Sequence, residues 1–529
     1  MRVVIYVNRT ICIGKNMMKS TYWCIAKPIS LLLAIANTQL CLPLAAVAHP
    51  ILNASLNTSF KIVQQPLPNA TTAVCPAQLG TAIAALLDRP QLNRGRWGIA
   101  IQTRSRGDTL YSRDAQNYFI PASNVKLFTT AAALQQLGSQ FQIRTSVYRT
   151  IAGGLRVIGR GDPSLTDMQL QALAKQVRQQ EIRRISQLVA EDDYFQGPII
   201  NPSWQWEDIK ADYGAPVNSL ILNQNTVELT AIPQQVGQPL RLNWSDLREG
   251  MQWQIENEAI AIPTSKSSAI NVSRNSSAVI LKVTGQMGID APPASVNLAV
   301  VDPKEHFLRH FRRSLAKEGI GEIPPSNEQR SEERQYTLVP RELAFVVSPP
   351  LSELLVETNQ NSNNLYAEAL LRILGARLQP TPIAQTTADI GLQSVKNTLT
   401  ALGIEPSGYI LTDGSGLSRQ NLASPEAIAQ TLRIMANSPL ASVYRASLPI
   451  AGVSGTLKSR FRGTTAQGIV LAKTGTMSGV VALSGYINSP NYEPLVFSII
   501  VNQSDQPASV LRQTVDSIVL LLTRLQRCE

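Results

Sequence analysis

The chain has 529 residues, of which 44% are hydrophobic and 16% are charged, and its formal net charge is +11 at pH 7. A chain of this length exceeds one ordinary hydrophobic core, so we expect two or three domains. The basic residues are spread along the sequence without a basic run or an RNA-binding aromatic motif, which argues against a nucleic-acid partner.

The first 48 residues have the pattern of a Sec-type signal peptide. They contain five basic and no acidic side chains, then the apolar stretch Ile29–Ala36 and the small-residue sequence Leu44–Ala48. Cleavage there would remove the five positive charges and lower the net charge from +11 to about +6. We therefore expect a periplasmic protein, with Met17 or Met18 as alternative starts. No other stretch predicts a membrane helix, so no stable membrane anchor is expected.

The next elements alternate between helices and strands. Residues 49–74, rich in Asn, Thr and Pro, are expected to form a flexible lead-in. The pattern then predicts a helix over Ala77–Leu87, strands over Trp97–Thr103 and Thr109–Arg113, and a helix over Pro121–Leu134.

Residues 146–325 are rich in short β-branched runs separated by turn signals. We expect strands in Ser219–Asn223, Thr226–Thr230 and Ala278–Val283, and hence small β-rich domains with an inner piece at about 220–290.

The C-terminal part predicts an antiparallel sheet. Its strands are the apolar runs Gly468–Ala472, Val480–Ile487 and Pro494–Val501. The segment Leu511–Leu525 carries a helical apolar stripe and follows directly on a strand, so we expect it to pack on the sheet and not on a membrane surface.

Three short motifs occur in the order Ser123-Asn-Val-Lys126, Ser362-Asn-Asn364 and Lys473-Thr-Gly475. In the first motif, a nucleophile and a base lie one helical turn apart on the same face. In the second, Ser362 offers a hydroxyl for proton relay and Asn364 an amide that orients a substrate carbonyl. Each motif alone occurs by chance, but the ordered set indicates serine acyl transfer driven by lysine.

The base in such chemistry is usually a histidine. The chain has three histidines; His49 lies at the predicted cleavage point, and His306 and His310 lack the glutamate of H-E-x-x-H, so we interpret that pair as the surface of an amphipathic helix. Lys126 must then be the base. A free lysine is neutral in about one molecule in 2,500 at pH 7, so burial and the nearby cation Lys473 are expected to lower its pKa.

The third motif predicts a substrate-binding strand. Gly475 would let a substrate backbone lie close along the edge of the sheet, next to Thr474. The N–H groups of Ser123 and Thr476 are expected to hold a developing oxyanion.

The motifs resemble those of the penicillin-recognising serine enzymes, S-x-x-K, S-x-N and K-T-G. The long segment between the first two is similar to that of the class C low-molecular-mass penicillin-binding proteins, the D-alanyl-D-alanine carboxypeptidase/endopeptidases of the penicillin-binding protein 4 type. The segments Gly161–Leu165, Asp413–Arg419 and Ala451–Lys458 agree with that family.

The resemblance implies an α+β fold with a β-lactamase-like catalytic domain of antiparallel sheet and helices. This domain is expected to be discontinuous, formed by residues 75–145 and 326–529 and interrupted by the inserted β-rich segment 146–325.

The resemblance also implies three further substrate contacts. Asp208 and Tyr213 fall where relatives place an acid and an aromatic that reach the diamino acid of a stem peptide, with a structural role as the alternative. Arg419 would be a third contact. Where some relatives have a glutamine after the third motif, this chain has Ser478 or a neighbour, which leaves side-chain specificity open.

Of five cysteines, Cys12, Cys24 and Cys41 would leave with the signal peptide, so only Cys75 and Cys528 would reach an oxidising compartment. In the resembling fold, the first and last helices of the catalytic domain pack together on one sheet face. This implies a Cys75–Cys528 disulfide, with two free thiols as the alternative.

The resemblance implies a serine D-Ala-D-Ala carboxypeptidase that acts on peptidoglycan stem peptides through an acyl-enzyme, needs no metal or cofactor, and has β-lactam antibiotics as covalent inhibitors. The balance with D,D-endopeptidase activity, the diamino acid of the stem and the oligomeric state stay open. One alternative is a β-lactamase, against which the long insertion argues. Another is a cell-wall-binding protein without catalysis, against which the complete motif set argues.

Overall fold

The computed structural model describes residues 6–7, 10–11, 73–264, 269–274, 280–323, 341–378 and 385–528. The predicted signal peptide and lead-in lie almost wholly outside these residues; within them, β1 (Tyr6–Val7) pairs with β2 (Thr10–Ile11). The rest of the described chain belongs to one compact unit, Leu67–Glu529. No helix among the described residues is long and apolar enough to cross a bilayer.

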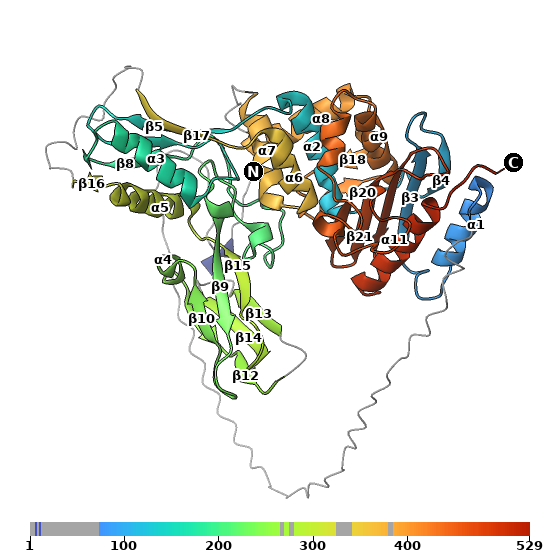
Figure 1. Cartoon of the computed structure of the whole chain (residues 1–529), viewed down its shortest axis with the longest axis horizontal. Coiled ribbons are helices and arrows are strands. Elements are labelled where there is room, and N and C mark those ends of the chain that lie inside the picture. The colour runs from blue at the N-terminus through green and yellow to red at the C-terminus, as the bar shows by residue number, and fades with distance from the viewer. Residues whose placement is uncertain are drawn as a thin grey trace, which may run out of the picture. The chain divides into compact units, whose positions relative to one another are not determined.

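A five-stranded antiparallel sheet forms the centre of the part of the chain that carries the three motifs (Figure 1). Its strand order is β20-β21-β22-β3-β4, so the strand that carries the third motif lies at one edge. The strands are β3 (Arg96–Thr103), β4 (Thr109–Arg113), β20 (Val470–Met477), β21 (Val480–Ile487) and β22 (Leu495–Asn502). Every residue of β21 and β22 is buried, which explains why both strands are mainly apolar instead of alternating between apolar and polar residues.

Helices cover both faces of this sheet. The helices α1 (Pro76–Leu87) and α11 (Ala508–Leu522) share one core with alternate side chains of the sheet. In this core, Ile83 of α1 and Val515 of α11 belong to the same cluster as Ile99 of β3. The predicted packing of the C-terminal helix on the sheet is therefore confirmed. The other face is covered mainly by α2 (Val125–Leu137), α6 (Leu351–Gln360), α7 (Asn364–Ala376), α8 (Thr387–Ala401), α9 (Pro425–Ala436) and α10 (Ala441–Ala446).

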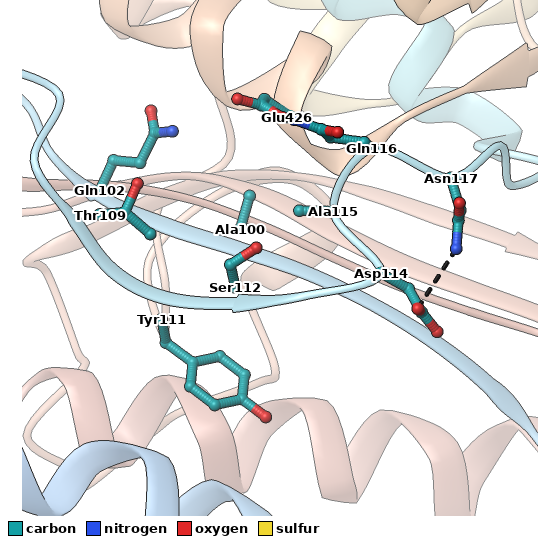
Figure 2. Close-up of a pocket in the computed structure, with 10 residues that line it drawn as sticks. All are labelled: Ala100, Gln102, Thr109, Tyr111, Ser112, Asp114, Ala115, Gln116, Asn117 and Glu426. Carbon is teal, nitrogen blue, oxygen red and sulfur yellow. Dashed lines mark hydrogen bonds between the residues drawn. The ribbon is translucent and has the colours of Figure 1, made fainter.

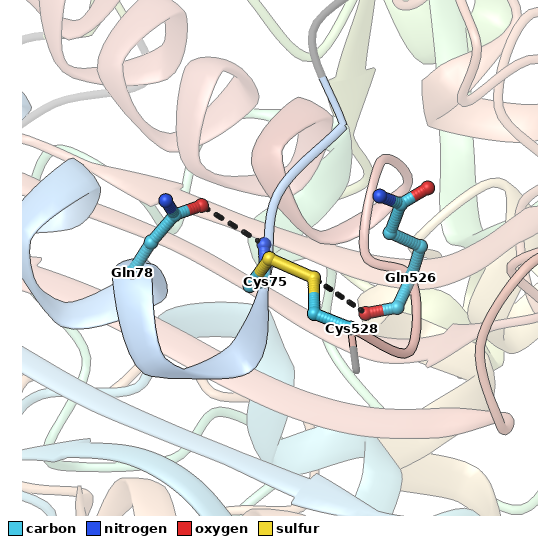
Figure 3. The surroundings of a disulfide bond; sticks show 4 residues. All are labelled: Cys75, Gln78, Gln526 and Cys528. Carbon is cyan, nitrogen blue, oxygen red and sulfur yellow. Dashed lines mark hydrogen bonds between the residues drawn. A yellow bond between two sulfur atoms is a disulfide. The ribbon is translucent and has the colours of Figure 1, made fainter.

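Residues near the two ends of the compact unit are joined covalently. Cys75 and Cys528 form a disulfide with a Cα–Cα separation of 5.7 Å (Figure 3). Backbone hydrogen bonds support the junction, because Val74 donates to Arg524 O at 3.0 Å and Gln526 donates to Val74 O at 3.1 Å. The pairing that the resemblance implied is thus present.

The segment between the first two motifs is built from smaller sheets. One has the order β17-β5-β6-β8 and is packed by α3 (Asp167–Gln179) and α5 (Pro303–Lys317). Its strands are β5 (Arg144–Arg149), β6 (Leu155–Ile158), β8 (Leu188–Glu191) and β17 (Glu342–Val347). A parallel pair joins β7 (Arg184–Ile185) to β16 (Gly321–Glu322).

Two further sheets share a separate core in the inner part of this segment. In one, β9 (Thr226–Ile232) lies between β10 (Arg241–Trp244) and β15 (Ala294–Ala299). In the other, β14 (Ile280–Gly288) pairs with β11 (Gln254–Asn257), β12 (Ile260–Ile262) and β13 (Ala269–Arg274). The single-turn helix α4 (Leu247–Gly250) joins β10 to β11. The division into domains stays a prediction.

The predicted strand Ser219–Asn223 is wrong. Its N–H groups do not enter a ladder, because the carboxylate of Asp192 accepts hydrogen bonds from the amides of Ser219 at 2.7 Å and Leu220 at 3.0 Å. Leu220 and Leu222 are buried in the core beneath α3 and α5. The apolar residues of this segment therefore indicate a buried loop and not a paired strand.

The interpretation of His306 and His310 as helix surface is also wrong. They are only 2% and 5% exposed, on the face of α5 that turns inward. His306 Nδ1 lies 3.0 Å from Glu249 Oε1, and His310 lies 2.6 Å from Asp167 Oδ1 and 3.0 Å from Asp246 Oδ2. Acidic partners from α3 and from the turn around α4 make this burial possible.

Candidate active site

The first motif lies where a 3₁₀ turn, Ala122–Asn124, leads into α2. Ala122 has a left-handed backbone with φ of 48°, a strained conformation for a residue with a Cβ. The turn brings Ser123 over the start of the helix, and Lys126 Nζ donates a hydrogen bond to Ser123 Oγ at 3.1 Å. The predicted contact of nucleophile and base is therefore present.

Lys126 is fully buried, and three oxygens surround its amine. Besides Ser123, its Nζ donates to Asn364 Oδ1 at 2.6 Å and to the carbonyl of Ser415 at 2.7 Å. Burial lowers the pKa of Lys126 to about 7, against the opposing influence of two buried carboxylates, Asp413 and Glu368. A substantial fraction of the amine is therefore neutral near pH 7 and able to accept a proton.

Lys473, the buried lysine of the third motif, lies beside the middle motif. Its Nζ donates to Ser362 Oγ at 2.8 Å and to the carbonyl of Thr474 at 3.0 Å. Burial, followed by the charge of Lys126, holds the pKa of Lys473 well below its usual range. We expected burial and Lys473 to lower the pKa of Lys126. Burial is the lowering cause, and the repulsion between the two lysines appears in the lowered pKa of Lys473.

The middle motif begins helix α7. Ser362 has a left-handed backbone with φ of 59°, and Asn363 is the N-cap, whose Oδ1 accepts from the amide of Tyr366 at 3.2 Å. The side chain of Asn364 reaches Lys126 on one side and donates through Nδ2 to the carbonyl of Tyr213 at 2.8 Å on the other. The motif thus touches the first motif and the inserted segment together.

Gly475 is required by the protein itself. A Cβ at this position would lie 2.9 Å from the carbonyl oxygen of Pro121 and 3.1 Å from the Cβ of Ala122, so the absent side chain lets the nucleophile turn pack on the edge strand. From the sequence, we expected Gly475 to make room for a substrate backbone. Its packing against Pro121 and Ala122 was not predicted. Thr476 is exposed on the same strand, where its predicted role in the oxyanion site stays a prediction.

The three substrate positions implied by resemblance lie close together. The Tyr213 hydroxyl donates to Asp208 Oδ1 at 3.3 Å, and Arg419 Nη1 donates to the carbonyl of Ser478 at 3.0 Å. Burial raises the pKa of Asp208, and the Tyr213 hydrogen bond and the charge of Arg419 act in the opposite direction. An acid, a phenol and a guanidinium are therefore grouped beside the strand of the third motif.

A separate polar groove of about 380 Å³ lies at the opposite edge of the sheet, beside β3 and β4 (Figure 2). Its floor includes Ala100 and Ser112, and the loop that follows β4 closes one side, where Asn117 donates to Asp114 at 3.2 Å. Figure 2 shows the Tyr111 ring directed away from the other lining side chains. None of the three motifs lines this groove.

Comparison with known proteins assigns the chain to a family. The model of the D-Ala-D-Ala carboxypeptidase 3 (S13) family matches residues 79–525, a range that includes all three motifs. The chain belongs to this family. It is a serine D-Ala-D-Ala carboxypeptidase, as the resemblance of its motifs implied.

Curated relatives cover most of the chain. A D-alanyl-D-alanine carboxypeptidase of Actinomadura sp. (strain R39) is 34% identical over 84% of this chain and 84% of the relative. Penicillin-sensitive carboxypeptidase A of Dictyostelium discoideum is 30% identical over 81% of this chain and 87% of the relative.

The fold of this S13 peptidase is also that of a solved structure. Penicillin binding protein 4 from Haemophilus influenzae superimposes with a TM-score of 0.68 over 86% of this chain and 98% of that chain, at 23% sequence identity. The expected α+β fold is thereby confirmed.

Several parts of the S13 site were not assigned from the sequence. The carbonyl of Ser415 contacts the buried lysine, and Glu368 holds this carbonyl in place by accepting from the amides of Gly414 and Ser415 at 2.8 and 2.9 Å. Thr456 accepts from Thr474 Oγ1 at 2.8 Å. The segments containing Ser415 and Thr456 were recognised as family-like, which is the one signal that pointed to them.

Proposed function

We propose that this S13 carboxypeptidase removes the terminal D-alanine from peptidoglycan stem peptides, with Ser123 as the nucleophile and Lys126 as its base. The observation that supports this most directly is the 3.1 Å hydrogen bond between the buried amine and the serine hydroxyl. A hydroxyl becomes an effective nucleophile only when a neighbouring base takes its proton.

In the proposed acylation, Ser123 Oγ attacks the carbonyl carbon of the D-Ala-D-Ala bond as its proton passes to Lys126 Nζ. The carbon–nitrogen bond then breaks, and the proton held on Lys126 passes through Ser362, whose hydroxyl is held by Lys473, to the amine of the leaving D-alanine. In deacylation, water attacks the ester as Lys126 takes one of its protons, and this proton passes to Ser123 Oγ as the ester bond breaks, which restores the serine. The N–H groups of Ser123 and Thr476 are proposed to stabilise the negative charge on the carbonyl oxygen.

The inserted segment is proposed to bind the side chain of the stem peptide's diamino acid. Asp208, with the Tyr213 hydroxyl beside it, offers a partly buried negative charge to the free amine of a diamino acid. Arg419, which bonds the carbonyl next to the third motif, is proposed as a contact for a carboxylate on the same substrate. Stem peptides are exported to the cell wall, which fits the predicted signal peptide and a periplasmic location.

A fluorescent penicillin tests the nucleophile. The strained lactam carbonyl mimics the scissile bond while its leaving group stays tethered, so we expect covalent labelling of Ser123 and complete loss of labelling in Ser123→Ala. Peptide mapping should find the label on Ser123, and persistent labelling of the alanine variant would contradict the assignment.

Two assays separate the alternatives. Release of D-alanine from a stem pentapeptide, with little turnover of nitrocefin, is expected for the carboxypeptidase, whereas rapid nitrocefin turnover would indicate a β-lactamase. Failure of any penicillin to attach would favour a binding protein without catalysis. Mass spectrometry of digested muropeptides would also reveal cleavage of D,D cross-links.

The variant Asp208→Ala tests the proposed recognition of the stem peptide. It is expected to slow hydrolysis of peptides with a free side-chain amine and to leave penicillin acylation nearly unchanged. The antibiotic lacks that distal amine. Equal losses for both ligands would mean that Asp208 supports the fold instead.

A further inference from the structure

Three consecutive residues of the inserted segment have a left-handed backbone. The φ angles of Asn223, Gln224 and Asn225 are 47°, 57° and 52°. None of them is glycine, and this conformation costs energy for any residue with a Cβ. Asparagine tolerates it better than glutamine, because its short side chain bonds nearby backbone groups. Such strain persists only where the surroundings enforce it.

The two asparagines account for how the turn is held. Asn225 is buried, and its Nδ2 donates to the carbonyl of Pro216 at 2.8 Å and to Asn218 Oδ1 at 2.9 Å. Asn223 Nδ2 donates to Asp167 Oδ2 at 2.9 Å. Both side chains therefore tie the strained turn to the body of the inserted segment.

The side chain of Gln224 contributes nothing to its own turn. It is exposed, and its Oε1 accepts a hydrogen bond from Asn363 Nδ2 at 2.7 Å. Asn363 is the central residue of the middle motif, so the strained turn places the amide of Gln224 in contact with this motif.

This contact helps to fix the orientation of the Asn363 side chain. Its Nδ2 bonds both Gln224 and Glu357 Oε1, the latter at 3.1 Å, while its Oδ1 caps helix α7. Asn363 follows directly on Ser362, whose left-handed backbone presents its hydroxyl to Lys473. A loosened Asn363 would let this turn relax and move the hydroxyl away from the lysine.

The inserted segment makes a second contact with the same motif. The carbonyl of Tyr213 accepts from Asn364 Nδ2 at 2.8 Å, which leaves Asn364 Oδ1 directed at Lys126. Adjacent residues of the motif are thus each held by one hydrogen bond from the inserted segment.

We propose that Gln224 is a positioning residue for the acylation step, acting through Asn363 to hold Ser362 against Lys473. This role rests on the proposed acylation of Ser123, which is tested separately by labelling of the unaltered protein. The strain of the turn is maintained because it places this amide beside the motif.

Rapid mixing of the whole mature protein with a fluorescent penicillin separates the maximal acylation rate from the half-saturating concentration. In Gln224→Gly, the left-handed backbone is relieved and the hydrogen bond is lost. We expect an unchanged or higher Tm, a maximal acylation rate about three- to tenfold lower, as for loss of one hydrogen bond, and a half-saturating concentration within about twofold.

Glu181→Gly is the matched control. Glu181 is also exposed, left-handed with φ of 61°, and located in the inserted segment. It bonds no part of the three motifs among the described residues. The same relief of strain should leave its acylation rate unchanged. An acylation rate of Gln224→Gly within about twofold of the unaltered protein would overturn the proposal.

If Gln224→Gly lowers the Tm, a slower acylation could come from lost stability. A second pair of variants then tests the positioning role. Gln224→Met and Gln224→Glu keep both the length and the strain of the side chain, but only glutamate retains the acceptor for Asn363. Slow acylation in the methionine variant with recovery in the glutamate variant supports positioning. Equal effects in the two variants, or no effect in either, would overturn it.

Discussion

At the scale of single residues, we expect the titration of Lys126 to control the proposed acylation. Its pKa is lowered to about 7 by burial, and only the neutral amine accepts the proton of Ser123. We expect the rate of penicillin acylation to fall about tenfold for each pH unit below 7 and to level off above it. The pH dependence of labelling, measured under single-turnover conditions, checks this.

The variant Lys126→Arg is the control for this profile. A guanidinium stays protonated at every accessible pH, so we expect at least a tenfold loss of acylation throughout and no rising limb. A rate that stays flat from pH 5.5 to 8.5 in the unaltered protein, or an arginine variant that acylates normally, would rule out general-base catalysis by Lys126.

A second buried group, Asp162, links a single residue to stability. Burial raises its pKa to about 6, although Ser164 donates to its Oδ1 through both the backbone amide and the hydroxyl. The folded carboxyl therefore keeps its proton up to about pH 6, whereas the unfolded chain loses it near the ordinary aspartate pKa of 3.8. This contribution to stability is present at low pH and is lost as the pH rises from 3.8 to about 6.

Asp162→Asn imitates the protonated side chain at every pH. We expect the variant to match the unaltered protein near pH 4 and to exceed its free energy of unfolding by up to about 3 kcal/mol at pH 7. Urea unfolding at the two pH values measures the difference. A difference between the two proteins that does not grow with pH would show that the carboxylate is ionised in the folded state.

At the scale of elements, the edge strand β20 and the nucleophile turn depend on each other. Gly475→Ala would place a Cβ 2.9 Å from the carbonyl of Pro121, so either the strand or the turn must shift. We expect a loss of about 1–3 kcal/mol in the free energy of unfolding and at least a tenfold slower acylation. Gly321→Ala, where a Cβ would meet no atom within 4 Å, should change neither quantity. Normal acylation in Gly475→Ala would show that the turn tolerates the shift.

The elements also show what a sequence can predict. The strands of the central sheet and three of the helices on its faces, α1, α2 and α11, were predictable because long apolar runs and helical stripes record burial directly. The run Ser219–Asn223 has the same composition, but its amides bond the distant carboxylate of Asp192, and such a side-chain partner leaves no local pattern. The burial of His306 and His310 depends in the same way on acids from other elements.

The candidate site shows the same contrast between local patterns and distant partners. Ordered motifs made five of its residues predictable: Ser123, Lys126, Ser362, Asn364 and Lys473. The carbonyls of Ser415 and Tyr213 were not, since every residue has a carbonyl and only the fold selects these two. Gln224 was missed because its importance rests on a backbone conformation and a partner far away in the chain.

At the scale of the whole molecule, the Cys75–Cys528 disulfide closes the chain across a separation of 453 positions. A cross-link restricts the unfolded chain more than the folded one, and the typical stabilisation is about 2–4 kcal/mol. The folded termini are already joined by the backbone bonds between Val74 and the last residues. We therefore expect Cys75→Ser with Cys528→Ser to lower the Tm while leaving the rate of penicillin acylation within about twofold. Thermal unfolding of both proteins, with and without reductant, measures the effect, and reductant should shift only the unaltered protein. Equal Tm values, or two alkylatable thiols in exported protein, would show that the bond does not stabilise the native enzyme.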